Sequence, residues 1–194
     1  AAVAKAIARW GNEDFSVALG QDSAPIPADP AEQFQIFLAG FQPTDLVWVG
    51  ELYDHREAFA AHLRTPADHV FNPRLDLTRT WTFRSPEGGR KKENQADLRA
   101  LVVEHDGLDR AGQAAFFRLV SATLGLPRLV MSTGGKGFHA HFDAPADIAV
   151  ARQLFPFVQA SGADHIAFGT GATRAPGAIR PETGNRQSIV WLRN

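Results

Sequence analysis

The strongest constraint on the fold lies in the second half of the chain, where strand-like and helix-like apolar segments alternate. Strands are predicted at 100–107, 128–132, 138–143 and 188–192, and helices at 109–125 and 147–162. Pro156 predicts a kink or an early end in the second helix. The two middle strands flank the loop TGGKG and are expected to pair as an antiparallel hairpin. This order indicates an α+β unit in which helices cover one face of a mostly antiparallel sheet, while the other face is free to hold a site.

The first half is less regular. Residues 1–10 look helical, and residues 11–30 are rich in Pro, Gly and Asp, which predicts a linker. The expected elements that follow are a helix at 31–40, a buried strand at 45–52, a charged helix at 54–63 and short strands at 69–74 and 77–84, ahead of a basic loop at 85–94. We therefore predict an N-terminal helix and linker at 1–30 and one domain at 31–194, made of an α/β module at 31–95 and a second module at 96–194.

Composition excludes several classes of site. The chain contains no cysteine, so disulfides, thiolate zinc sites, iron–sulfur clusters and cysteine nucleophiles are excluded, and any metal must be held by oxygen or imidazole. A net charge of -1 leaves room for a local basic patch but is unusual for a protein that coats DNA electrostatically. No apolar run approaches the roughly 18 to 20 residues that span a bilayer. These features predict a cytoplasmic protein with no membrane partner.

Two carboxylates end the first strand of the second module. Side chains alternate between the faces of a strand, so Glu104 and Asp106 are expected on the same side, about 7 Å apart at their α-carbons, with His105 on the other. Like charges at this spacing repel unless a cation lies between them, and oxygen ligands suit Mg²⁺ or Mn²⁺. For this pair alone, the alternative is a solvated strand end.

The segment MSTGGKGFHAHF is a candidate anion site. Glycines let backbone N–H groups converge on an anion, and Lys136 adds a positive charge suited to phosphate. Phe138, Ala140 and Phe142 alternate with His139 and His141, so the aromatic rings are expected in the core and the two imidazoles on the opposite, partly exposed face. For the loop alone, the alternative is an ordinary glycine-rich turn with an exposed lysine.

Taken in order, LVVEHD, STGGKGFH, the later GAD and an Arg-x-Pro-Gly segment that leads into a Thr-Gly turn resemble the catalytic core of the archaeo-eukaryotic primase superfamily. The run KKENQADLRALVVEHD looks like its plasmid and phage branch. The resemblance covers about residues 89–191 and implies a mostly antiparallel, RRM-like palm sheet with helices on one face, here at 96–194, preceded by an N-terminal α/β module. Residues 31–194 would then be a primase-polymerase catalytic domain.

The resemblance also implies roles for individual residues. The metal-binding carboxylates would be Glu104, Asp106 and Asp164, although a lone Asp in a loop such as Asp164 is usually a cap or turn residue. The triphosphate of the incoming nucleotide would be contacted by Ser132, Thr133, Lys136, His139 and Arg174. Glu104 stands where many members have Asp. The hairpin is one residue longer than the shortest family version, which leaves both Ser132 and Thr133 as candidates for the hydroxyl position.

The implied activity is template-dependent nucleotidyl transfer by a DNA primase or primase-polymerase in DNA replication. It would use two Mg²⁺ or Mn²⁺ ions and NTP or dNTP substrates to make or extend primers on single-stranded DNA. The chain starts without Met and ends at a strand, which suggests a domain of a longer protein, with a helicase or a primer-stabilising domain as further partners. The expected template surface is basic with interleaved aromatic side chains: Arg74, Arg79, Trp81, Phe83, Arg84, Arg90, Lys91 and Lys92.

Two other functions stay open at the level of sequence. His139-Ala140-His141 fits the His-hydrophobic-His metal motif of single-strand nicking endonucleases, for which Tyr53 would be the nucleophile because it is the single tyrosine. That family does not explain the acidic strand end or the glycine–lysine loop. A replication-initiator module that binds single-stranded DNA without catalysis would need basic and aromatic residues but no ordered carboxylates.

Overall fold

One four-stranded antiparallel sheet forms the centre of the second half of the chain. Its order is β10-β7-β8-β6, with β6 at Ala100–Val103, β7 at Leu129–Ser132, β8 at Phe138–Asp143 and β10 at Ser188–Leu192. The computed structural model describes residues 1–50, 59–163 and 172–194, so Tyr53 and Asp164 lie outside the described residues. In β7 and β8, Met131 is opposite His139 and Leu129 is opposite His141. This is the hairpin that the sequence predicts around TGGKG.

Two long helices cover one face of this sheet. They are α5 (Arg110–Leu124) and α6 (Ile148–Ala160), and each begins at an aspartate, Asp109 or Asp147, whose carboxylate accepts a backbone N–H of the first turn. Phe138, Ala140 and Phe142 of β8 pack in the core beneath these helices, as the alternation in the sequence predicts. The helix α6 continues through Pro156 to Ala160 and does not end early.

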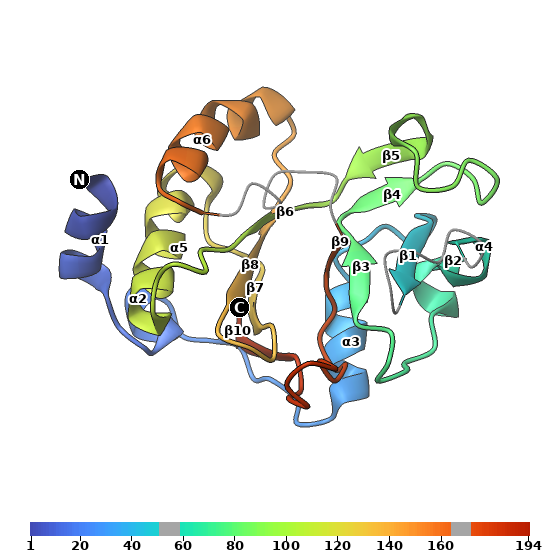
Figure 1. Cartoon of the computed structure of the whole chain (residues 1–194), viewed down its shortest axis with the longest axis horizontal. Helices are drawn as coiled ribbons and strands as arrows, with labels where there is room; N and C mark the ends of the chain where they lie inside the picture. The colour runs from blue at the N-terminus through green and yellow to red at the C-terminus, as the bar shows by residue number, and fades with distance from the viewer. Residues whose placement is uncertain (51–58, 164–171) are drawn as a thin grey trace.

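The N-terminal segment joins the same core. Helix α1 (Ala2–Trp10) was expected, but the predicted linker at 11–30 also contains α2 (Phe15–Leu19), which Asp14 caps. The ring of Phe15 is buried, 6.2 Å from that of Phe117 and 5.1 Å from that of Phe138. Figure 1 shows α1 and α2 beside α5, on the helical side of the sheet. Segment 11–30 is therefore partly a packing element.

A second four-stranded antiparallel sheet has the order β2-β1-β3-β9, with β1 at Val47–Gly50, β2 at Leu63–Arg64, β3 at Leu77–Arg79 and β9 at Ala172–Arg174. Strand β9 therefore comes from the predicted second module and pairs with a strand of the first. The helix α3 (Pro30–Leu38) packs between the sheets through Phe34, Phe37 and Leu38. Its side chains contact Leu129, Met131 and Ile189, so part of the face of the first sheet that was expected to be free is covered.

The remaining elements lie beside the second sheet, away from α5 and α6 (Figure 1). They are α4 (Phe59–His62), two 3₁₀ turns at Pro66–Asp68 and Lys92–Asn94, and the hairpin of β4 (Trp81–Phe83) and β5 (Gln95–Leu98). The predicted strand at 69–74 does not form: this stretch is irregular, and Nε2 of His69 lies 2.9 Å from the carbonyl oxygen of Val47. Across the described ranges, no helix has the length and apolar character needed to cross a membrane.

Candidate active site

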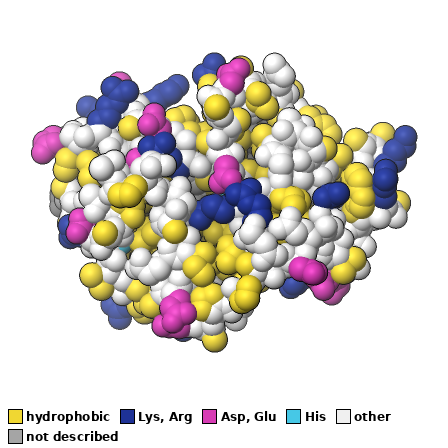
Figure 2. All heavy atoms as spheres, turned by 180° about the vertical axis from the view of Figure 1, so that it is seen from behind, with side chains coloured by type: hydrophobic (Ala, Val, Ile, Leu, Met, Phe, Trp, Pro, Cys, Tyr) yellow, Lys and Arg dark blue, Asp and Glu magenta, His cyan; other side chains and the backbone are white. Residues whose placement is uncertain are grey.

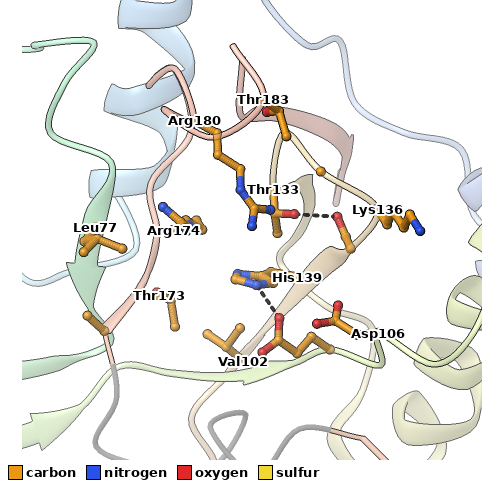
Figure 3. A pocket seen from close by; sticks show the side chains of 14 residues that line it. Leu77, Val102, Asp106, Thr133, Lys136, His139, Thr173, Arg174, Arg180 and Thr183 are labelled. Carbon is orange, nitrogen blue, oxygen red and sulfur yellow. Dashed lines mark hydrogen bonds and ion pairs between the residues drawn. The ribbon is translucent and has the colours of Figure 1, made fainter. Parts of the chain in front are cut away.

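A pocket of about 460 Å³ opens between the two sheets (Figure 3). Its walls come from β6, the 133–137 loop, β8, the β3–β9 edge and the segment before β10. The lining residues are Leu77, Val102, Glu104, Asp106, Thr133, Gly135, Lys136, Gly137, His139, Ala172, Thr173, Arg174, Arg180 and Thr183. Most of the residues singled out in the sequence therefore meet in one cavity, whose size lies within the range of small-molecule sites.

Glu104 and His139 are joined directly. The antiparallel register places Val103 of β6 opposite Ala140 of β8. One residue closer to the pocket, Glu104 is therefore opposite His139. The Nε2 atom of His139 lies 2.6 Å from Oε2 of Glu104. Burial alone would raise the pKa of Glu104, but the hydrogen bond and charge of His139, with Arg174 and Arg180, outweigh burial and lower that pKa below its ordinary value.

Asp106 lies on the same side as Glu104 and is exposed at the pocket edge. A Cβ atom added to Gly137 would lie 2.7 Å from its Oδ1 atom, so the glycine lets the carboxylate and the loop approach each other. His105 points to the opposite side, as the alternation predicts. Its ring packs 5.2 Å from that of Phe116, and its Nε2 atom lies 2.8 Å from the carbonyl oxygen of Ser161.

The hydroxyl candidates Ser132 and Thr133 have different environments. Thr133 lines the pocket, and its Oγ1 donates a hydrogen bond of 3.0 Å to the carbonyl of Gly137, which closes the loop. Ser132 is a strand residue paired with Ser188 and Phe138, and its Oγ accepts from the N–H of Gly134 at 3.3 Å. The residue facing the cavity is therefore Thr133, while Ser132 supports the start of the loop.

The loop after Thr133 has donors that are not used within the described residues. The backbone N–H groups of Gly135 and Lys136 have no acceptor among them. Lys136 itself is exposed, and Figure 3 shows its side chain directed away from His139 and the two pocket arginines. These two N–H groups are therefore left for water or a ligand, as far as the described residues go.

Gln113 holds this loop on helix α5, a role that sequence reasoning missed. Its side chain is buried, its Oε1 accepts from the N–H of Phe138 at 2.9 Å, and its Nε2 donates to the carbonyl of Leu108 at 2.9 Å. The same Nε2 lies 3.4 Å from the carbonyl of Lys136. A buried polar residue inside the apolar spacing of α5 was the available signal.

Two arginines, Arg174 and Arg180, line the pocket together with Lys136. Arg174, at the end of β9, forms an ion pair with the buried carboxylate of Asp76. Arg180 lies close to the glycine loop, since its Nη1 atom would lie 2.4 Å from a Cβ atom on Gly135. Figure 3 shows Arg180 reaching over the loop from the C-terminal segment, between Arg174 and Thr133.

The turn that carries Arg180 is fastened to the glycine loop. The hydroxyl of Thr183 donates a hydrogen bond of 2.7 Å to the carbonyl of Gly134, and Nδ2 of Asn185 donates to the same oxygen at 3.2 Å. This contact joins residues about fifty positions apart in the chain, so local patterns give no sign of it. Arg186, by contrast, donates to the carbonyl of Gly177 and does not line the pocket.

The expectation of two partly exposed histidines is wrong. His139 is 7% exposed and His141 is fully buried, with its ring 5.6 Å from that of Phe37 in an edge-to-face arrangement. The face that they occupy is covered by α3 and the second sheet. Burial lowers the pKa of His141 well below its ordinary value, so the ring is neutral. His141 is a core residue under the site.

The side chains of the pocket that could bind a metal ion are the carboxylates of Glu104 and Asp106 and the imidazole of His139. In residues 1–50, 59–163 and 172–194, no group of three or more His, Asp or Glu side chains is arranged to hold a metal ion. The predicted third ligand, Asp164, falls outside these ranges. Glu104 and Asp106 line one pocket and offer the oxygen atoms that Mg²⁺ and Mn²⁺ prefer, so the donor chemistry fits such an ion.

The expected template surface is divided between the core and an exposed loop. Phe83 is buried and packs 5.1 Å from Phe59, whereas Arg84, Lys91 and Lys92 are exposed. Buried Asn94 fastens this loop, because its Nδ2 donates to the carbonyls of Ser85 and Gly89 at 2.7 and 2.8 Å. Figure 2 shows the opposite face of the molecule, with Lys and Arg side chains gathered at the corner where this β4–β5 hairpin lies.

The comparisons with known proteins bear on the fold of the chain. A scan against protein-family models and a search among curated proteins give no match. Among solved structures, the chain is similar to the AEP (archaeo-eukaryotic primase) domain of the primase-polymerase (PrimPol) of cyanophage S-2L. The TM-score is 0.51 at 18% sequence identity, over 84% of this chain and 90% of that chain. The chain therefore has the fold of an archaeo-eukaryotic primase domain.

Proposed function

We propose that this chain is a template-dependent nucleotidyltransferase, a DNA primase or primase-polymerase domain that makes or extends primers on single-stranded DNA. One observation carries the proposal: within a primase-type fold, a pair of carboxylates, a glycine loop and two arginines line a single pocket. A nucleotide–metal complex needs carboxylates that bind the metal ions and positively charged groups that bind the phosphates, and this pocket contains both.

In the proposed complex, Glu104 and Asp106 would hold Mg²⁺ or Mn²⁺, with Asp164 as the third ligand that the resemblance implies. When bound, the metal ions would stabilise the attacking 3′-hydroxyl and the leaving pyrophosphate. The chain's own part is to hold the nucleotide in line for attack. Arg174, Arg180 and the backbone amides of the loop neutralise the β- and γ-phosphates of an NTP or dNTP, and this positions the α-phosphate.

His139 connects the two halves of the site. Its Nε2 atom lies at 2.6 Å from Glu104, and its ring lines the same pocket as the arginines. We propose that it orients the Glu104 carboxylate and contacts the triphosphate. A charged or hydrogen-bonding ring at this place would reduce the repulsion between the triphosphate and the carboxylates of Glu104 and Asp106.

The template is proposed to lie along the β4–β5 hairpin. Residues 84–94 carry four basic and two acidic side chains, and the hydrogen bonds of Asn94 keep their backbone in one shape. A basic surface of fixed shape can bind the phosphate backbone of single-stranded DNA without recognising its base sequence. A helicase or a primer-stabilising domain is a proposed partner, and plasmid or phage replication in the cytoplasm is the proposed setting.

The nicking-endonuclease alternative loses support from the structure. It needs His139 and His141 as joint metal ligands, but His141 is fully buried and packs against Phe37. The two rings are 6.3 Å apart, with His141 beneath the site. No observation in the described part of the chain favours that function.

The direct test is incubation with single-stranded templates, labelled NTPs or dNTPs, and Mg²⁺ or Mn²⁺, followed by sizing of the products. Template-dependent products that require the metal are expected. Binding of single-stranded DNA with no product under any nucleotide and metal would favour the non-catalytic binding module instead.

A further inference from the structure

An ion pair at the edge of the pocket involves a residue to which no role has been given. Asp76 directly precedes β3, and Arg174 ends β9, where it is opposite Leu77. The carbonyl of Asp76 accepts the N–H of Ala175 at 2.7 Å, so the backbones of both partners are held by the sheet. The carboxylate of Asp76 then pairs with the Nη1 group of Arg174. The sheet thus fixes the backbone of both residues of the ion pair.

The two partners differ in their exposure. The Asp76 side chain is 3% exposed, whereas that of Arg174 is 21% exposed and lines the pocket. Within the described ranges, Oδ1 of Asp76 has no hydrogen-bond partner. Burying a carboxylate costs free energy, and a buried ion pair seldom repays that cost in stability alone. This arrangement is better explained by what it does to the arginine.

We propose that Asp76 is a positioning residue that holds the guanidinium of Arg174 toward the phosphates of the bound nucleotide. A guanidinium has five donors in a rigid plane, so the carboxylate can fix one edge while other donors face the cavity. Arg180 packs over Gly135 and lies beside Arg174 in Figure 3, and the two arginines would bind the polyphosphate together. This inference rests on the proposed function, because it assigns the pocket a polyphosphate ligand.

The direction in which the substitution Asp76→Asn changes anion affinity tests the inference. It removes a negative charge close to the pocket, so an unaltered Arg174 would bind an anion more tightly. If Asp76 positions Arg174, the same substitution weakens anion binding instead, because the arginine loses its fixed orientation. The two explanations predict opposite changes.

The chain offers a matched control in Asp45. Its carboxylate is also buried and pairs with an arginine, since Nε and Nη2 of Arg99 lie 2.7 Å from its two oxygens. Neither Asp45 nor Arg99 lines the pocket. Asp45→Asn should therefore lower stability without changing anion affinity, which separates positioning from a general loss of packing.

The experiment is calorimetric titration of the whole chain with sodium tripolyphosphate in the presence of Mg²⁺, with thermal unfolding of each variant recorded in parallel. Asp76→Asn is expected to weaken binding roughly five- to thirtyfold. Arg174→Lys, which keeps the charge but not the planar fork, should weaken it to a similar degree. Adding Asp76→Asn to Arg174→Lys should then have little further effect, because both changes remove the same interaction.

Unchanged or tighter binding by Asp76→Asn would overturn the inference, as would a wild-type chain that does not bind tripolyphosphate. If Asp76→Asn does not fold, unchanged affinity in Arg174→Lys overturns it equally. Primer synthesis is scored separately. If tripolyphosphate binding depends on Asp76 but the chain makes no product, the proposed function is contradicted and the inference stands. If the chain makes products but Asp76→Asn does not change tripolyphosphate binding, the proposed function stands and the inference is overturned.

Discussion

The Nε2 atom of His139 lies 2.6 Å from Oε2 of Glu104, which joins the imidazole of β8 to the carboxylate that follows β6. The resemblance to primases gives these two residues separate partners, a metal ion and a triphosphate. In the structure they form one hydrogen-bonded pair in the wall of the pocket. Metal and nucleotide are therefore expected to bind interdependently, because each is proposed to contact one member of the pair.

Replacing His139 with Ala should weaken nucleotide affinity as well as turnover. Losing a charge-assisted phosphate contact costs about 1.5 to 3 kcal/mol, or roughly ten- to a hundredfold in binding. His141→Leu is the matched control on the same strand, because His141 is fully buried and should change affinity little. A nucleotide titration measures both. Equal losses in the two variants would return His141 to the site and favour the nicking-endonuclease function.

Stability should fall as the solution becomes acidic. Burial lowers the pKa of His141 well below its ordinary value of 6.5 and also lowers that of His69. Below pH 6.5 the two histidines bind protons in the unfolded chain but not in the native chain, so the free energy of unfolding decreases until the pH reaches their native pKa values. Above pH 6.5 these two groups do not make the free energy of unfolding depend on pH.

The check is urea unfolding of the wild type and His141→Leu at several pH values from about 5 to 7.5. The variant should show a smaller acid loss. At neutral pH it should be at least as stable as the wild type, since neither ring nitrogen of His141 has a hydrogen-bond partner among the described residues. An unchanged pH slope in the variant would show that His141 is not buried as a neutral ring.

Charge reversal on the β4–β5 hairpin should weaken template binding. Lys91 and Lys92 are exposed, so Lys91→Glu and Lys92→Glu remove phosphate contacts without loss of packing. On single strands, each lost contact should reduce the slope of log affinity against log salt by about 0.7. Lys5→Glu, on the exposed side of α1, is the control and should leave the slope near that of the wild type. Equal slopes in all three variants would remove the hairpin from the template path.

Tyr53→Phe should keep template-dependent synthesis close to the wild-type rate. A primase-polymerase forms no covalent intermediate, whereas a nicking endonuclease must form a phosphotyrosyl bond. No adduct with single-stranded DNA should survive denaturing electrophoresis in either protein. An adduct that disappears in Tyr53→Phe would overturn the proposed function.

Much of the site follows from local patterns in the sequence. The two-residue period of a strand separates Glu104 and Asp106 from His105, and the structure has them on opposite sides. The hairpin around TGGKG follows from two apolar runs and a glycine turn. Both predictions succeed because they depend on residues within one strand or on two neighbouring strands.

The rest depends on contacts between distant segments. The exposure of His141 was misjudged because alternation gives the face of a strand but does not show that α3, about a hundred residues away, covers it. The place of Arg180 in the pocket could not be predicted, because its turn is held at the loop by the contact between Thr183 and Gly134, which lie far apart in the sequence. Helix α2 was missed because Pro, Gly and Asp surround a single helical turn whose Phe15 is stabilised by tertiary packing.

The most direct test of the central claim compares two neighbouring aspartates in primer synthesis on single-stranded DNA with Mg²⁺ or Mn²⁺. Asp106 is exposed in the pocket, whereas Asp109 caps α5 by accepting the N–H of Gly112 at 2.8 Å. Asp109→Ala should lose about 1 kcal/mol of stability and keep synthesis. Asp106→Ala should keep its unfolding temperature and lose synthesis by a hundredfold or more, since even outer-shell partners of a metal are worth roughly ten- to a hundredfold. Near wild-type synthesis by Asp106→Ala would contradict the account.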